Sequence, residues 1–386
     1  MQTLTAQGTA REKIDMKKQN GTINLIKFLM AVGILLMHAG MEFGFDRFQG
    51  TWIFVEWFYI FAGYCVTKEV VKKAWPAAAS AATPAAASAA MTGTTDGAPA
   101  ESADPGELTF GILKKRICAI FPYFFVASLL GLVIQMAAGS LKFGSVNDTA
   151  WIAEDLLMLQ MTGLNLTGRS IMGTTWFLSA MWIALALIIP CIAKMKKYFV
   201  LVLSLLLPAL IYGYLDVTTG YLWSPAIWVG FAVKGTLRAI AGISLGAFSY
   251  GLGERLKEGL VRPKAESLLL YAGYALVFFF TWRYGDSEWF WMIPYLFMVL
   301  VAVGMAKKPG WDVPDTRFTR LLGKVSMLLF INHVYNIYAI QTAFPQWSLP
   351  RKMFITLLAA CVCMAVSYFG GEALKKLWHS KKNALK

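Results

Sequence analysis

Lys27 and His38 lie eleven residues apart in one apolar run, a spacing that could serve acid–base chemistry. At about 100° per helical residue they share one face to within roughly 20° and lie about 16 Å apart along the axis. A histidine can take a proton from a hydroxyl near neutral pH, and a lysine can bind an anion. Alternatively, Lys27 reaches lipid headgroups and His38 only bonds a neighbouring helix. Spacing alone leaves both interpretations open.

Glu56 is a second ionisable group in an apolar setting, within the run VEWFYIFAGY. If this run enters the membrane from the side where the first one leaves, Glu56 lies at a depth similar to that of His38. A carboxylate beside an imidazole orients it and raises its basicity. We therefore expect Glu56 to pair with His38, with a purely structural ion pair as the alternative.

Three further charged or ionisable residues interrupt later apolar runs. Lys234 and Arg238 are four residues apart and share a helix face, where two cations need an anion or a wet cavity. His333 follows an asparagine about 18 Å into its run. Measured from the ends of the runs, all three lie at the depth of His38 and Glu56. We expect these five side chains to line one polar chamber in the outer half of the membrane.

The elements that must hold these residues are membrane helices. Hydrophobic residues make up 57% of the chain and charged residues 15%, against roughly a quarter in soluble domains, which excludes a soluble fold. Runs of about 20 apolar residues match single membrane spans. We predict an all-α integral membrane protein of about ten transmembrane helices, near residues 23–44, 51–70, 117–138, 175–193, 198–215, 228–250, 266–283, 288–306, 321–343 and 353–374.

The positions of the basic residues predict the orientation. The net charge of +14 does not indicate nucleic acid, because Lys and Arg cluster at the ends of apolar runs. With both termini cytoplasmic, 27 of the 36 Lys and Arg fall on inside segments. Six fall outside: Arg47, Lys142, Arg169, Arg283, Arg351 and Lys352. This asymmetry predicts a multi-pass protein of the plasma (inner) membrane with an even number of spans.

The chain divides into a cytoplasmic N-terminal segment (1–22), a transmembrane domain (23–374) and a basic cytoplasmic tail (375–386). Residues 75–107 are rich in Ala, Pro, Ser and Thr, which predicts a disordered cytoplasmic linker inserted in that domain. The segment 151–163 is too short and acidic for a span and is expected to form a surface or re-entrant helix. The first run could be a cleaved signal peptide, but His38 and Glu42 stand where small residues should follow, so we expect it to be retained.

Several motifs, in order, resemble the membrane-bound acyltransferase family 3, whose bacterial members O-acylate surface glycans. Lys27-x10-His38 resembles the family's Arg/Lys-x10-His signature, and VEWFYIFAGY resembles its F-F-x-x-S-G-F/Y segment. The later matches are Lys115-Arg116-Ile117 with Phe121-Pro122-Tyr123, then Thr175-Trp176-Phe177-Leu178-Ser179, and finally Leu322-Gly323-Lys324-Val325-Ser326 with Phe330-Ile331-Asn332-His333. Together they extend from residue 23 to about residue 335.

The resemblance implies transfer of an acyl group, most often acetyl, from acyl-CoA to a hydroxyl of a glycan or lipid-linked sugar. It makes His38 the catalytic histidine, as base or acyl relay, and Lys27 its donor-side partner. From the residues themselves we expect Glu56 to hold the tautomer of His38. The cluster Lys114, Lys115 and Arg116 offers cations for the CoA phosphates, although the positive-inside rule also accounts for it.

On the acceptor side, the resemblance offers Trp176 as an aromatic platform for a sugar, with Ser179 and His333 beside it. Lys234 or Arg238 could stabilise the oxyanion or hold an acidic acceptor. No metal is expected, because the five cysteines show no zinc-type spacing with histidines.

The sequence also departs from the family pattern. Ala62 stands where the family usually has serine, so no nucleophilic serine acts there, and Lys27 replaces the commoner arginine. A transporter or flippase of a polar or anionic substrate is the main alternative, since buried polar groups also suit a substrate pathway. The first two runs, however, contain no proline that would break their helices. A receptor without chemistry would not need a basic entrance leading to a histidine.

Overall fold

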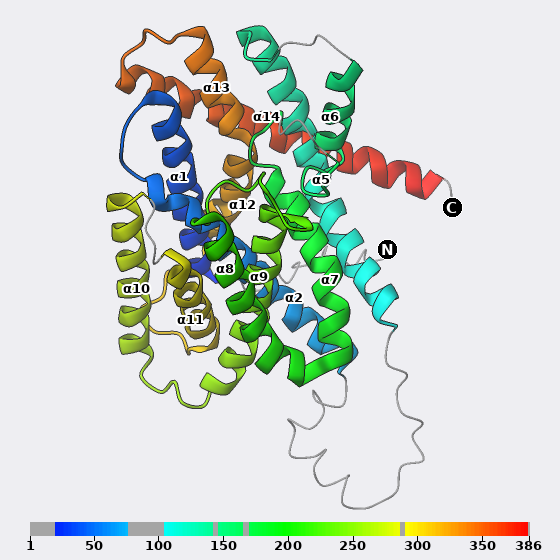
Figure 1. The fold of residues 1–386 in the computed structure, drawn as a ribbon, viewed down its shortest axis with the longest axis vertical. Helices are drawn as coiled ribbons and strands as arrows, with labels where there is room; N and C mark the ends of the chain where they lie inside the picture. Colours follow the sequence, from blue (N-terminus) through cyan, green and yellow to red (C-terminus); the bar gives the residue numbers. More distant parts are fainter. Residues whose placement is uncertain (1–19, 76–103, 142–145, 165–169, 286–289, 385–386) are drawn as a thin grey trace, which may run out of the picture.

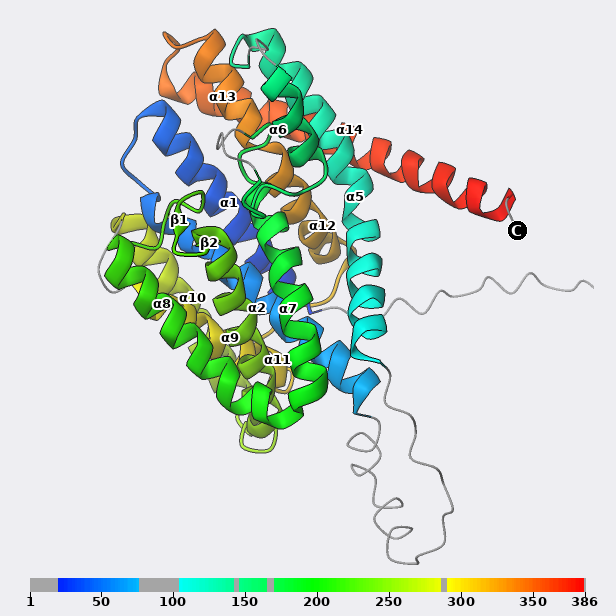
Figure 2. The same cartoon turned by 45° about the vertical axis from the view of Figure 1, so that its right-hand side comes forward.

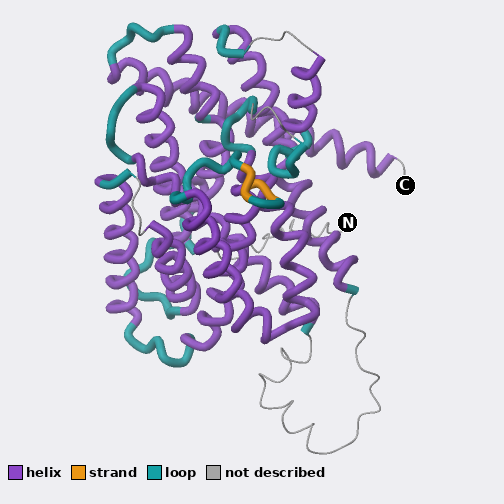
Figure 3. Tube along the Cα trace, viewed as in Figure 1, coloured by secondary structure: helices purple, strands orange, loops and turns teal. Residues whose placement is uncertain are grey.

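The computed structural model describes residues 20–75, 104–141, 146–164, 170–285 and 290–384. Residues 1–19 of the predicted N-terminal segment and residues 76–103 of the predicted Ala/Pro-rich linker lie outside these ranges. Residues 21–22 begin the first helix, and residues 105–107, predicted to be linker, begin another. The described chain is a helical bundle with one short hairpin, seen among the loops in Figure 3. The hairpin pairs β1 (Trp228–Val229) with β2 (Ala232–Val233) in antiparallel fashion.

The helices of the bundle follow the apolar runs of the sequence (Figure 1). They are α1 (Gly21–Phe43), α2 (Phe54–Ala74), α5 (Pro105–Ala138), α6 (Val146–Leu156), α7 (Trp176–Tyr198), α8 (Ser204–Thr219), α9 (Lys234–Leu256), α10 (Pro263–Arg283), α11 (Ile293–Ala306), α12 (Arg317–Asn332), α13 (Val334–Ala343) and α14 (Leu349–Ala384). Short 3-10 or π turns precede α2, α8 and α11: η1 (Gln49–Ile53), η2 (Phe199–Leu203) and η3 (Phe290–Met292).

Each of the ten predicted spans overlaps one or two of these helices. Among the described residues, five helical stretches are long and apolar enough to cross a membrane: Gly21–Phe43, Pro105–Ala138, Trp176–Thr219, Pro263–Arg283 and Leu349–Trp378. The chain is therefore an all-helical, multi-pass membrane protein, whereas the count of ten spans and the orientation stay predictions. The segment predicted to be a surface or re-entrant helix contains most of α6, whose 11 residues are too few to cross.

The third of these stretches contains two helices, because the chain reverses direction at Lys196. Lys196 has φ 50° and ψ −127°, which no helix accommodates. Lys196 therefore kinks the last turn of α7, which ends at Tyr198, and α8 runs back along the bundle (Figure 2). This reversal separates the two spans that the sequence predicts at 175–193 and 198–215.

α9 is the central helix, packing against α2, α7, α8 and α11. Its closest approach is to α2, through glycines on both helices. A Cβ added at Gly63 would lie 2.2 Å from the Ile243 carbonyl oxygen, and one at Gly246 would lie 2.1 Å from the Ile60 carbonyl oxygen. Only glycine allows such backbone contact. The Gly242-x3-Gly246 pattern is thus a contact within one chain.

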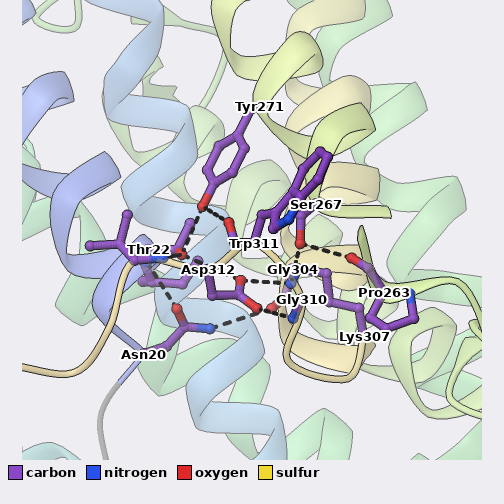
Figure 4. Close-up of polar contacts among 12 residues, drawn as sticks. Asn20, Thr22, Pro263, Ser267, Tyr271, Gly304, Lys307, Gly310, Trp311 and Asp312 are labelled. Carbon is purple, nitrogen blue, oxygen red and sulfur yellow. Dashed lines mark hydrogen bonds and ion pairs between the residues drawn. The ribbon is translucent and has the colours of Figure 1, made fainter. Parts of the chain in front are cut away.

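α1 packs on the other side of the bundle, against α12 and α13. A polar cluster fixes its first turn to the loop that precedes α12 (Figure 4). The Asp312 carboxylate accepts hydrogen bonds from Lys307 Nζ at 2.6 Å and Thr22 Oγ1 at 3.4 Å. Lys307 also donates to Ser267 Oγ on α10 at 3.0 Å. These contacts set the position of α1 and hence of Lys27 and His38.

We predict that Gly246→Ala destabilises the protein by about 1–3 kcal/mol, because the new methyl group must push the α2 backbone away. Gly213→Ala in α8 is the matched control, since a Cβ there meets nothing within 4 Å. It should be neutral or stabilise by about 0.5–1 kcal/mol. Unfolding of both variants in one detergent measures the difference, and equal stabilities would contradict the close α2–α9 contact.

The Asp312 cluster predicts an acid-sensitive contribution to stability. Burial works against ionisation, but hydrogen bonds from Lys307 and the Gly310 N–H outweigh it and lower the pKa of Asp312. The stabilisation is therefore complete above the unfolded-state pKa of about 3.9 and is lost as pH falls through the lower folded value. Asp312→Asn should lower Tm at pH 7 and show less further loss on acidification. Asp46→Asn, at an exposed site, should follow the wild type; an identical acid profile for Asp312→Asn would refute the assignment.

Candidate functional site

The structure brings two histidines from distant parts of the chain together. His38 lies on α1, and His333 lies at the junction of α12 and α13, where the helix is interrupted. Their ring centroids are 5.3 Å apart with an interplanar angle of 48°. The pair forms because α1 packs against both α12 and α13.

The hydrogen bond of His333 to the backbone indicates which of its ring nitrogens carries the hydrogen. His333 Nδ1 lies 2.9 Å from the Leu329 carbonyl oxygen, and because a carbonyl only accepts, Nδ1 carries the hydrogen. In the neutral ring Nε2 is then an acceptor. It is buried and has no partner among the described residues. His333 therefore presents an unprotonated nitrogen inside the protein, next to the ring of His38.

Asn332 holds the α12–α13 junction in place. Its side-chain oxygen accepts hydrogen bonds from Tyr335 Oη at 2.6 Å and from Ser367 Oγ on α14 at 2.8 Å. Its amide nitrogen donates to the Leu328 carbonyl at 2.8 Å. A fully buried asparagine thus has its hydrogen-bonding groups satisfied, which keeps the neighbouring His333 in one orientation.

A cavity of about 390 Å³ is lined by cationic and aromatic side chains, and neither His38 nor His333 is among its lining residues. Lys27 and Arg116 line it, together with aromatic rings from several helices: Phe58, Phe61, Phe177 and Phe330. The Phe330 ring is also 6.2 Å from the His333 ring, centroid to centroid. A second cavity of about 370 Å³ shares Lys27 with the first and adds Arg320 and Lys324.

Lys27 lines both cavities, as do Phe61 and Gly323. Its Nζ lies 4.3 Å from the centroid of the Phe61 ring, a cation–π contact. Among the described residues no carboxylate forms an ion pair with it. The donor-side role predicted for Lys27 stays a prediction.

The three cations predicted for the donor side differ in position. Arg116 lines the first cavity, and its Nη2 lies 3.1 Å from Glu69. Lys115 also reaches Glu69, at 3.4 Å, but is exposed, and Lys114 is exposed over the Phe110 ring. Of the three, Arg116 is the one that faces the cavity.

The predicted pairing of Glu56 with His38 is wrong. Glu56 accepts a hydrogen bond from Arg238 Nε at 2.6 Å and another from Tyr212 Oη at 2.9 Å. A fully buried carboxylate requires a nearby cation, and the close packing of α9 on α2 supplies Arg238. Glu56 therefore joins α2 to α9 and α8 and does not orient His38.

Lys234 also has a different role from the one expected. Its Nζ donates to the carbonyls of Tyr221 at 2.6 Å and Trp223 at 3.2 Å, and lies 3.8 Å from the centroid of the Tyr221 ring. It secures the loop before the hairpin. The predicted single chamber is accordingly replaced by three groups: the histidine pair, the Glu56–Arg238 pair and Lys234.

The two acceptor residues predicted on α7, Trp176 and Ser179, lie in different surroundings. Trp176, the first residue of α7, is half-buried, and its ring centroid lies 5.5 Å from Arg238 Cζ. Ser179 is buried and accepts a hydrogen bond from the Met161 N–H at 3.0 Å, so it fixes the preceding loop. Thr236 Oγ1 on α9 donates to the Met161 carbonyl at 2.9 Å, so side chains from α7 and α9 both hold the Met161 backbone.

Asp155 is a site-positioning residue that sequence reasoning missed. It is buried at the end of α6 and accepts hydrogen bonds from the Ile171 N–H at 2.7 Å, Ser170 Oγ at 3.1 Å and Thr175 Oγ1 at 3.2 Å. These bonds shape the loop that delivers Trp176. The signal was the acidity of residues 151–163, which excluded a span but also marked a buried carboxylate.

Within the described ranges, no group of three or more His, Cys, Asp and Glu could hold a metal.

We predict that Glu56→Gln costs about 3–5 kcal/mol of stability, because it leaves the Arg238 charge buried without a counterion. Tyr212→Phe, which removes one hydrogen bond to the same carboxylate, should cost only about 1 kcal/mol. Replacing both charged partners, as in Glu56→Leu with Arg238→Met, should be less damaging than Glu56→Gln alone. Unfolding in detergent measures all three, and equal losses for Glu56→Gln and Tyr212→Phe would exclude a structural ion pair.

Comparison with known proteins gives one family. The sequence model of the acyltransferase domain, acyltransferase family 3, matches residues 104–371, which is more than half of the chain. No curated protein and no solved structure matches the chain.

The matched region begins directly after residues 76–103, so it contains His333, Trp176 and Arg238 but not Lys27 or His38. The motif that first indicated the family thus lies before the matched region, on α1. The family is shown by residues 104–371, and the helical fold carries the apolar stretches that a membrane enzyme needs. The chain belongs to acyltransferase family 3 and is a membrane acyltransferase.

Proposed function

We propose that the protein moves an acyl group, most simply acetyl, from acyl-CoA to a hydroxyl of a cell-surface glycan or a related acceptor. The observation that carries this proposal is the His38–His333 pair, which the Phe330 ring separates from a cavity that Lys27 also lines. Such a site offers a base for a hydroxyl, a channel for a long donor and a cation for its phosphates.

The two cavities suit the two parts of an acyl-CoA. The phosphates of CoA would bind where Lys27, Arg320 and Lys324 meet, because ionised donors bind phosphate oxygens strongly. The narrow pantetheine arm would occupy the aromatic cavity, whose volume of about 390 Å³ fits an arm and not a whole CoA. Arg116 adds a second cation at the same cavity.

During the transfer one proton moves from the acceptor hydroxyl to His38 and then from His38 to the CoA thiolate. His38 takes the proton from the acceptor hydroxyl while that oxygen attacks the thioester carbonyl. When the C–S bond breaks, the imidazolium returns the proton to the CoA thiolate. Alternatively, His38 is acylated first and passes the acyl group on, which would suit a donor and an acceptor on opposite sides of the membrane.

His333 takes the orienting role first assigned to Glu56. Its Nε2 can accept a hydrogen bond from the ring of His38, which would hold one tautomer and stabilise the charged imidazolium. A neutral partner suits a membrane interior better than a second charge does.

We predict that His38→Ala lowers acyl transfer from radiolabelled acetyl-CoA by about 100-fold or more, the usual size of a general-base contribution. The third histidine of the chain, His379 in the basic tail, supplies the control: His379→Ala should keep full activity. Both variants must insert and elute from a sizing column like the wild type. Undiminished transfer by folded His38→Ala protein would reject this mechanism.

A further inference from the structure

Two buried hydrogen-bond donors lie close together beside Trp176. Arg238 Nη2 and Trp52 Nε1 are both buried, and neither has an acceptor among the described residues. The Arg238 Cζ atom lies 5.1 Å from the centroid of the Trp52 ring and 5.5 Å from that of the Trp176 ring. Buried donors are nearly always paired in proteins, so two adjacent exceptions call for an oxygen acceptor.

Both donors are held in fixed positions. The Trp52 indole stacks on Phe290 with centroids 5.8 Å apart and an interplanar angle of 23°. Arg238 is held by its Nε bond to Glu56 at 2.6 Å. Trp176 is half-buried and is thus the part of this cluster that a solute can reach. The three side chains therefore form a rigid group with one accessible aromatic surface.

The net charge of these three side chains determines whether the ligand oxygen can be charged or must be neutral. The Glu56 carboxylate already neutralises Arg238, so Trp52, Arg238 and Trp176 together carry no excess positive charge. The nearest other cation on α9, Lys234, donates to the carbonyls of Tyr221 and Trp223. A carboxylate or phosphate bound here would leave one buried negative charge without a counterion, which costs several kcal/mol. A hydroxyl, ring oxygen or amide carbonyl would satisfy the same donors without this penalty.

We propose that Trp52, Arg238 and Trp176 form the acceptor subsite and that it selects an uncharged sugar over an acidic one. The sugar stacks on the Trp176 ring while one or two of its oxygens accept from Trp52 Nε1 and Arg238 Nη2. This inference rests on the proposed function, because it names the acceptor class of the same enzyme. It adds Trp52 to the site and replaces the acidic acceptor that the two cations of α9 first suggested.

The test uses two probes that differ only at one carbon. Methyl β-D-glucopyranoside and sodium methyl β-D-glucuronide are mixed in equal amounts with the purified full-length protein, and saturation-transfer NMR measures binding of each. We expect the neutral glycoside to bind more tightly. Trp52→Phe, which keeps the ring but removes the N–H, should weaken its binding by about 5-fold or more.

Trp75→Phe is the matched control, because Trp75 Nε1 is also buried without a partner in the described chain but lies at the opposite end of α2. It should bind the neutral glycoside like the wild type. Equal or tighter binding of the glucuronide, unchanged binding by Trp52→Phe, or binding of neither probe would each overturn the subsite.

A parallel assay of acetyl-CoA consumption separates this inference from the proposed function. A protein that consumes acetyl-CoA but binds neither glycoside retains the acyltransferase proposal and loses the neutral-sugar subsite. A protein that binds the neutral glycoside through Trp52 but never consumes acetyl-CoA keeps the subsite and loses the proposed reaction.

Discussion

The buried ion pair between Glu56 and Arg238 is the interaction on which the arrangement of this bundle depends. Two opposite charges in an apolar interior must stay together, because either one alone costs several kcal/mol. The pair can form at 2.6 Å only because glycines let α2 and α9 touch along their backbones. Tyr212 adds α8 to the same contact. The requirement for charge balance thus fixes three helices at once and places Trp52 and Trp176 beside Arg238.

The helical elements could be predicted from the sequence, because the length of an apolar run reflects the solvent and not the details of packing. The helices overlap the predicted spans for this reason, and the short acidic α6 was excluded as a span on the same grounds. Five helical stretches are long and apolar enough to cross a membrane. The total number of spans also depends on where the bilayer lies, and helix length does not give that position. Helix length alone is also misleading at Lys196, because the kink there divides one long apolar stretch into two helices.

The candidate site was only partly predictable, because depth in the membrane does not specify which helices are neighbours. His38, Glu56, Arg238 and His333 all lie in the bundle, yet α1 packs on α12 and α13 while α2 packs on α9. Partners therefore differ from those that depth suggested, and His38 contacts His333 instead of Glu56. Lys234 illustrates a second limit: its carbonyl partners belong to a loop whose path no periodicity encodes.

The α2–α9 contact also bears on how the enzyme can move. Backbone against backbone leaves no flexible side chain to absorb a displacement, so α2 and α9 must move as one rigid body, with Glu56 and Arg238 attached. The contact of α2 with α1 is softer, because the Phe54 ring is what faces Gly33 there. Any opening and closing during turnover would then occur as a shift of α1 and α12, which carry Lys27, His38 and the Phe330 ring, against this rigid pair.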